Sequence, residues 1–391
     1  MSWDIASLFS DDTEADRAFR AEVRDFVRDN CPPELKRHGF RIDPPALKPW
    51  HRRLYERGWA APHWPKEYGG MGATLTQQII LFEEIVRAGA PTPYPHGLNF
   101  IGPIIIKAGT EEQKARFLPS ILSGEATWCQ GYSEAGAGSD LASLNTRAVL
   151  DGDHFVVNGH KMWTTNGHYA DWMFALVRTD PEAKPRHAGI SMLLIDMRTP
   201  GITVKPIQTL KGDAEFAEEF FDNVRVPQEN LLGGINQGWR IAGMVLGGER
   251  FTTGHPRYAL VYLNQARQIA KETGAWDNPT FRARLTELEI DLLAFLAYYR
   301  QAAKLHGANA APLSMAPVIK IAGGGLAQRS SELLMLAAGG RGPSVEDFPL
   351  QSGPVNIGSE LFEMRRLSIG SGTLEINRNI IAKRVLGLPD E

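Results

Sequence analysis

The middle of the chain carries a sequence pattern that narrows the possible folds. Residues 124–236 contain short apolar runs separated by Gly, Pro and turn dipeptides such as Asp151-Gly152 and Asn158-Gly159. Such runs indicate strands, and these dipeptides favour the turns that close two-residue hairpins. No helical stretch of about ten residues separates the strands, so parallel strand–helix–strand units are not expected. The pattern predicts an antiparallel β-domain, a small barrel or a sandwich, with strands at 147–150, 154–157, 172–177, 190–195 and 220–226.

Helical patterns flank this middle part on both sides. Phe19, Val23 and Val27 follow helical spacing, and Thr74 and Thr110 each precede a Gln by three positions, the pattern of a capping box. From about residue 237, apolar steps of three and four indicate a helix bundle. We therefore predict an α+β fold with an N-terminal helical domain (1–123), a middle β-domain (124–236) and a C-terminal four-helix bundle (237–391). The predicted bundle seam is Leu285, Leu288, Leu292, Phe295 and Tyr299.

Composition excludes several classes of protein. The formal net charge is −3 and Lys and Arg are scattered, which argues against the basic patch of a nucleic-acid-binding protein. No apolar run approaches the roughly 20 residues that span a membrane, and no signal peptide is apparent. Cys31 and Cys129 form no disulfide framework and have no neighbour at metal-ligand spacing. We therefore expect a cytoplasmic protein without a metal site, in which both cysteines are structural.

The segment 127–140 (TWCQGYSEAGAGSD) is the first candidate for a functional site. Its glycines would allow a ligand to approach the backbone closely, and its hydroxyls could donate to the ligand. By itself, a plain turn before a hairpin explains the segment equally well. Two later segments strengthen the functional interpretation, MWTTNG at 162–167 and SGTLE at 371–375. In this order and over this span, the three segments resemble the acyl-CoA dehydrogenase family, and the resemblance extends over nearly the whole chain.

The resemblance implies an FAD site without a Rossmann fold. No Gly-x-Gly-x-x-Gly sequence follows a strand and opens a helix here, and Gly323-Gly324-Gly325 lies in a helical stretch. Ala135 replaces the usual Pro of the first segment, which removes no hydrogen-bond donor. For Trp163 the alternative is a core residue beside a hairpin, and for Glu375 a favourable charge in a first helical turn. The positions that match the family's cofactor contacts are Gln130, Tyr132, Ser133, Gly138, Ser139, Trp163, Thr164, Thr165, Thr373 and Glu375.

The resemblance also identifies candidate catalytic residues. Many family members carry the catalytic Glu where this chain has Ser371, and others carry it directly before an Arg on an earlier helix. Glu249, followed by Arg250, matches the second arrangement, although an exposed helical Glu-Arg pair is common. The backbone N–H of Ser371 would help to stabilise the enolate oxygen. Ser139 would touch the phosphopantetheine arm of the substrate, and Arg250 would hold the loop that carries Ser139 or contact the CoA moiety.

The implied activity is dehydrogenation of an acyl-CoA thioester to the trans-2-enoyl-CoA, a step of lipid β-oxidation, with hydride transfer to FAD and an electron-transfer flavoprotein as acceptor. His255-Pro256 should interrupt the helix after the base and could widen the acyl pocket. Two alternatives remain open, a related flavin oxidase or monooxygenase and a non-catalytic partner subunit.

Two departures from the family pattern concern the oligomer. Residues 272–279 lack the usual Arg-x-x-Phe-Gly segment, and Leu336 stands where a Gln normally precedes Gly339-Gly340. In the family these groups act across the subunit interface, where the Arg reaches the FAD pyrophosphate. We therefore expect a homo- or hetero-oligomer, a dimer or tetramer, in which either FAD is held more weakly or a partner subunit supplies the missing cation. The sequence resembles the bacterial branch that acts on steroid-derived and branched acyl-CoA esters.

Overall fold

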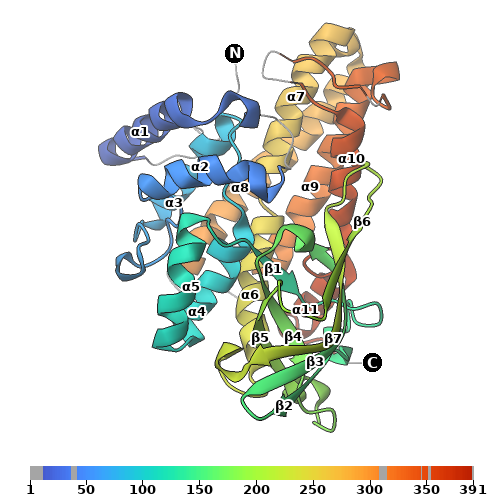
Figure 1. Ribbon diagram of the computed structural model, residues 1–391. Helices are drawn as coiled ribbons and strands as arrows, with labels where there is room; N and C mark the ends of the chain where they lie inside the picture. The colour runs from blue at the N-terminus through green and yellow to red at the C-terminus, as the bar shows by residue number, and fades with distance from the viewer. Residues whose placement is uncertain (1–11, 37–41, 308–314, 345, 351–353, 390–391) are drawn as a thin grey trace. The chain divides into compact units, whose positions relative to one another are not determined.

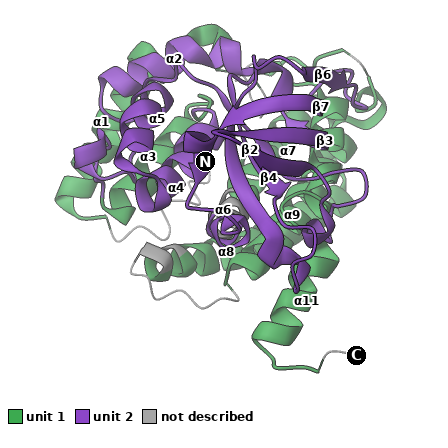
Figure 2. Cartoon of the chain, turned by 60° about the horizontal axis from the view of Figure 1, so that its bottom comes forward, with its two compact units in different colours: residues 1–42, 74–92, 249–391 green, residues 43–73, 93–248 purple. Residues whose placement is uncertain are grey.

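The computed structural model describes residues 12–36, 42–307, 315–344, 346–350 and 354–389, without the side chains of 245–252, 303, 306 and 307. The chain forms two compact units, and each unit consists of segments that are separate in sequence (Figure 2). Unit 1 comprises residues 1–42, 74–92 and 249–391, and unit 2 comprises 43–73 and 93–248. No helix in the described parts of the chain is both long and apolar enough to cross a membrane.

Unit 2 combines helices with one eight-stranded sheet (Figure 1). The strand order is β6-β7-β3-β2-β4-β5-β8, with β1 paired to β4. The helices of this unit are α2 (Pro44–Glu56), a π-helical turn (His96–Ile101), α4 (Gly102–Ala108), α5 (Glu111–Ser123) and the first part of α6 (Gly238–Thr253). The strands are β1 (Trp128–Gly131), β2 (Arg147–Asp151), β3 (His154–Thr165), β4 (Trp172–Arg178), β5 (Ile190–Asp196), β6 (Ile202–Ile207), β7 (Phe216–Pro227) and β8 (Leu231–Leu232).

The sheet corrects three details of the sequence-based prediction. Asn158-Gly159 does not form a turn but lies inside β3, at a register shift opposite β7. Such a dipeptide also suits a β-bulge, because Gly tolerates the irregular backbone of the inserted position. The sheet is not wholly antiparallel, since β1 pairs with β4 in parallel along its length and β2 does so at one position. Strands β1, β6 and β8 were not predicted as strands, whereas the hairpin at Asp151-Gly152 is confirmed.

Unit 1 is helical. It contains α1 (Glu14–Asn30), α3 (Leu75–Arg87), the last turn of α6, α7 (Arg257–Thr273), α8 (Pro279–Gly307), α9 (Met315–Ala338), α10 (Ile357–Arg365) and α11 (Leu374–Arg384). Helix α9 packs against α7, α8, α10 and α11 (Figure 1). Four of the five predicted seam residues on α8, Leu285, Leu288, Leu292 and Phe295, are buried, and the fifth, Tyr299, is partly buried against the same core. The fold class predicted from the sequence is thus confirmed.

Local sequence signals explain where several helices begin and end. Thr74 and Thr110 both form complete capping boxes with Gln77 and Gln113, as predicted. Helix α6 ends at Thr253 and α7 begins after Pro256, so the predicted interruption at His255-Pro256 is confirmed.

A close backbone approach explains one of the three glycines in α9. A Cβ atom on Gly323 would overlap the carbonyl oxygen of Gly254, at the break between α6 and α7. A Cβ on Gly254 would in turn lie 2.5 Å from the carbonyl oxygen of Ile319. Gly323 therefore serves helix packing, whereas a Cβ atom on Gly325 would meet nothing within 4 Å.

We predict that Gly323→Ala lowers the free energy of unfolding by about 1–3 kcal/mol, because the added methyl group must displace backbone. Gly325→Ala, on the same helix, is the matched control, since its methyl group would meet nothing within 4 Å. The control should be neutral or stabilising by up to about 1 kcal/mol, from the higher helix propensity of Ala. Chemical denaturation followed by circular dichroism measures both variants. Equal stabilities would contradict the packing role.

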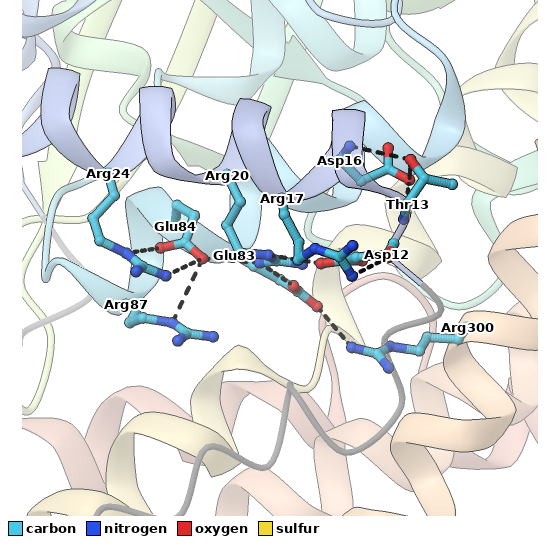
Figure 3. A network of polar contacts seen from close by, with 10 residues as sticks. All are labelled: Asp12, Thr13, Asp16, Arg17, Arg20, Arg24, Glu83, Glu84, Arg87 and Arg300. Atoms are coloured by element: carbon cyan, nitrogen blue, oxygen red, sulfur yellow. Dashed lines mark hydrogen bonds and ion pairs between the residues drawn. The ribbon is translucent and has the colours of Figure 1, made fainter.

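Charged side chains join three helices of unit 1 (Figure 3). Glu84 on α3 is 1% exposed and accepts hydrogen bonds from Arg20 (2.9 Å) and Arg24 (3.0 Å) of α1. The neighbouring Glu83 pairs with Arg20 (3.0 Å) and with Arg300 of α8 (3.2 Å). This network, here called the Glu84 network, therefore fixes α1 against α3 and α8.

Candidate functional site

The loop after β1 is shaped by the side chain of Glu134. The backbone of Glu134 exchanges two hydrogen bonds with Ala137, at 3.1 and 3.0 Å, which closes a tight turn. Its carboxylate accepts the backbone N–H groups of Asn145 (2.7 Å) and Thr146 (2.9 Å). Burial opposes the charged form, but Lys161 and these donors outweigh it and lower the pKa of Glu134. The loop is therefore closed at its base by an ionised carboxylate.

Lys161 links this loop to strand β3. Its side chain is fully buried, and its Nζ donates to the Glu134 carboxylate (2.9 Å) and to the carbonyl oxygen of Tyr132 (3.1 Å). Burial lowers the pKa of Lys161, and the Glu134 carboxylate counteracts that shift. In addition, the N–H of Met162 donates to the carbonyl oxygen of Ser133 at 2.9 Å. Two of the segments that resemble flavin-binding motifs, 127–140 and 162–167, are thus held side by side.

A β-bulge turns Trp163 outward. Trp163 has a left-handed backbone (φ 65°), and the register between β3 and β7 shifts at this point. As a result Trp163 is 55% exposed, whereas the next residue, Thr164, is buried and hydrogen-bonds to Glu219. Phe216 supports the indole edge-on, with ring centroids 6.0 Å apart. The bulge therefore presents a large aromatic face at the surface of unit 2, where a core residue was the alternative.

The predicted cofactor residues of unit 2 fall into two groups. Trp163, Gly138 and Ser139 are exposed, and Gln130, Ser133 and Thr165 are partly exposed. Tyr132 and Thr164 are buried as whole residues, at 4% and 1% exposure, so their side chains do not contribute to this surface. A Cβ on Gly136 or Gly138 would meet no atom within 4 Å, so open space lies over the loop. An exposed aromatic face beside an open, donor-rich backbone fits a flat ring system such as a flavin.

The predicted catalytic residues belong to unit 1, where a hydrogen bond connects two distant segments. Ser371 has a left-handed backbone (φ 58°), and its Oγ lies 2.7 Å from the Oγ1 of Thr253 at the end of α6. Glu249 lies four residues before Thr253 on the same helix, and residues at this spacing share a helix face. The side chains of Glu249 and Arg250 lie outside the described residues. The backbone nevertheless places the turn that follows Glu249 beside Ser371.

Thr373 and Glu375 open α11. The Thr373 hydroxyl accepts the N–H of Ile376 (3.1 Å) and caps the helix, which begins at Leu374. Glu375 is exposed in the first turn, a position where negative charge is favourable. In the structure, Thr373 and Glu375 both help to start helix α11. Their contact with FAD stays a prediction.

Three residues of these two sites were not singled out from the sequence. Glu134 and Lys161 form the buried pair below the loop, and Thr253 contacts Ser371. A signal existed for Thr253 alone, since its spacing of four from Glu249 marks a shared helix face. Nothing in the sequence pairs Glu134 with Lys161, because the ion pair depends on how the loop folds back onto β3.

Three family models match almost the whole chain. They are the acyl-CoA dehydrogenase N-terminal domain (residues 13–125), middle domain (129–224) and C-terminal domain (236–386). The chain belongs to the acyl-CoA dehydrogenase family. This family generally uses FAD, and the predictions of an oxidoreductase and of its family are confirmed.

The similar proteins include two from Mycobacterium tuberculosis and one whose structure is named as a steroid enzyme. Acyl-CoA dehydrogenase IpdE1 of Mycobacterium tuberculosis is 37% identical, covering 95% of this chain and 98% of its own. The solved structure named Tcur3481-Tcur3483 steroid ACAD has a TM-score of 0.87 at 31% identity, covering 97% of this chain and 99% of that one. The ChsE4-ChsE5 complex of M. tuberculosis has a TM-score of 0.84 at 32% identity, covering 98% and 100%.

Proposed function

We propose that this acyl-CoA dehydrogenase oxidises the α,β-bond of an acyl-CoA thioester, with Glu249 as the base that removes the α-proton. The observation that supports this choice is the hydrogen bond between Thr253 and Ser371. It brings the helix face that includes Glu249 to the position where other family members carry their catalytic Glu. A Ser at position 371 cannot remove a proton unaided, so the base must come from elsewhere.

The remaining residues bind and orient. FAD, bound at the exposed Trp163 face and the backbone of 133–139, would accept the β-hydride. Donors from this loop would stabilise the negative charge that develops on the pyrimidine edge of the flavin ring when it is reduced. The backbone N–H of Ser371 would donate to the thioester oxygen as the enolate forms, and this contact does not depend on the Ser side chain. Ser139 and Arg250 would contact the CoA part of the substrate.

We propose a bulky, ring-bearing acyl group, such as a steroid-derived one. The interruption of the helix between Thr253 and Arg257 supports this proposal, because it replaces a helical turn directly after the base. The rings of Phe82 and Tyr299 lie around His255 at this break, with centroids 4.3 and 4.9 Å away. An aromatic wall suits a fused ring system. The steroid enzyme among the similar structures is consistent with this choice.

The spectrum of the purified protein tests the proposed function. We expect a bound oxidised flavin whose visible absorption bleaches under anaerobic conditions when a ring-bearing acyl-CoA is added, and less with straight-chain acyl-CoAs. A flavin that no acyl-CoA bleaches would overturn the proposed reaction. Release of peroxide in air without another acceptor would instead indicate the flavin oxidase, and slow peroxide release would favour an electron-transfer flavoprotein as acceptor.

We also propose a mixed assembly with a second family member. Residues 272–279, which lack the usual Arg-x-x-Phe-Gly segment, form the end of α7, a 3₁₀ turn and the start of α8. Leu336 is 41% exposed on α9. Two of the similar structures carry the names of two different proteins, which supports a partner that supplies the missing cation. A stable homo-oligomer with full FAD occupancy, obtained from this chain alone, would refute the mixed assembly.

A further inference from the structure

Glu219 is a buried carboxyl group that the proposed chemistry does not use. It lies on β7, is fully buried, and stands opposite Lys161 of β3 and Val204 of β6. Its Oε2 lies 2.6 Å from the Thr164 hydroxyl, while its Oε1 has no hydrogen-bond partner among the described residues. A buried acid with one bonded and one unbonded oxygen is costly when ionised, so its presence calls for an explanation.

The contacts of Glu219 are with residues that follow Trp163 in the chain. Thr164, which follows Trp163 in the bulge, contacts Glu219 through its hydroxyl. The Oε1 of Glu219 lies so close to Gly167 that a Cβ atom on Gly167 would overlap this oxygen. Between these two contacts the chain passes through Asn166, which has a left-handed backbone (φ 55°). Glu219 thus supports both sides of the corner formed by residues 163–167.

Among the described residues, the cation that acts on Glu219 is Lys161, which stands opposite it on β3. The Nζ of Lys161 already donates to the Glu134 carboxylate and to the carbonyl oxygen of Tyr132. On β1, the buried thiol of Cys129 interacts with Glu219, and on β7 itself the preceding residue, Glu218, carries like charge and pairs with His160. Burial raises the pKa of Glu219 to about 8, although Thr164 and Lys161 act in the opposite direction. The group is therefore protonated at neutral pH.

We propose that Glu219 is a positioning residue for the flavin: its neutral carboxyl group holds Thr164 and Gly167 from inside and so sets the corner that presents Trp163 and Thr165. This inference rests on the proposed function, because it takes that corner as the flavin-facing one. Loss of the proton would place an unpaired charge behind the corner and attract Lys161 away from Glu134. The corner should then loosen, and the bound flavin with it.

The first experiment measures thermal stability as a function of pH and does not depend on flavin binding. Because the folded state keeps its proton while the unfolded chain loses it, Glu219 costs stability as pH rises from about 5 to about 8. Glu219→Gln cannot ionise, so its melting temperature should match the wild type at pH 5 and exceed it increasingly up to pH 8. Glu218→Gln, the partly exposed neighbour that pairs with His160, should not change with pH in this way. An equal gap at all pH values would show that Glu219 is not held neutral.

The second experiment measures the corner itself. Glu219→Leu and Thr164→Val remove the hydrogen bond, and hydrogen exchange at amides 163–169 should speed up by about tenfold in both. Glu219→Gln should restore protection near the wild-type rate. Unchanged exchange in the Leu and Val variants would overturn the positioning role. The Val variant decides the matter if the Leu variant does not fold.

The third experiment adds FAD. We expect the dissociation constant to rise by about tenfold in Glu219→Leu and to stay near the wild-type value in Glu219→Gln at pH 7. The wild type should show a change in flavin absorption near pH 8 that Glu219→Gln lacks. Equal affinities and pH profiles would refute the inference. A wild-type chain that binds no FAD would refute the proposed function instead, while the exchange data would still decide whether Glu219 fixes the corner.

Discussion

Replacement of Glu249 by Gln is expected to lower the rate of flavin reduction by acyl-CoA by about 10²–10⁴-fold, the usual contribution of a general base. Gln has nearly the same shape but cannot accept the α-proton. Because Glu249 is proposed to act on the substrate, the bound flavin should keep its amount and its visible spectrum. Anaerobic stopped-flow mixing with acyl-CoA measures the reduction step directly and separates it from reoxidation.

The hydrogen bond between Thr253 and Ser371 supplies a rescue for this variant. Since that bond brings the Glu249 helix to Ser371, a carboxylate introduced at residue 371 should reach the same substrate carbon. Ser371→Glu in the Glu249→Gln background is therefore expected to regain part of the lost rate, and Ser371→Gln in that background is the matched control that should not. Near-normal reduction in Glu249→Gln alone would place the base at another residue.

The sequence predicted those parts of the fold that depend on local chemistry. Thr74 and Thr110 each cap a helix together with a Gln three residues later. At His255-Pro256 the proline ring interrupts a helix. Pairing of distant strands was not predictable in the same way. The parallel contact of β1 with β4 joins segments about forty residues apart, and no local pattern encodes it. The prediction of a turn at Asn158-Gly159 was wrong for a related reason, because a dipeptide that suits a turn suits a β-bulge equally well.

In the candidate site, too, the features set by local sequence could be predicted and those set by long-range contacts could not. The exposed face of Trp163 and the open loop at Gly138 are consistent with the motif-based prediction, whereas the support behind them came only from the structure. One signal for that support was present in β7. Ala217, Glu219 and Phe221 alternate along the strand and are all buried, so period-two alternation alone would have placed Glu219 in the core. Its pairing with Thr164 depends on the bulge, which the sequence does not reveal.

The largest effect on stability is expected from Glu84 in unit 1. Glu84→Gln would remove the carboxylate that Arg20 and Arg24 share, and it would leave these cations and Arg87 facing one another. Breaking a buried ion pair by removing one partner costs about 3–5 kcal/mol. We expect a value near the lower end, because the side chains of Arg24 and Arg87 are 53% and 35% exposed. Glu332→Gln, which breaks the exposed pair with Arg365 (2.8 Å), is the control and should cost less than about 1 kcal/mol.

The dependence on pH distinguishes the charge of Glu84 from its packing. Burial opposes ionisation of Glu84, but its hydrogen bonds to Arg24 and Arg20 outweigh burial and lower its pKa below the ordinary value of 4.5. A lowered carboxyl pKa stabilises the folded state above that ordinary value, and the stabilisation is lost as pH falls below it through the folded-state pKa. The difference between wild type and Glu84→Gln should therefore be complete at pH 7 and shrink below about pH 4.5. Hydrogen exchange of the α1 and α3 amides measures it locally, without assuming that the two units unfold together. A difference that is the same at pH 7 and in acid would show that Glu84 acts through packing rather than through its charge.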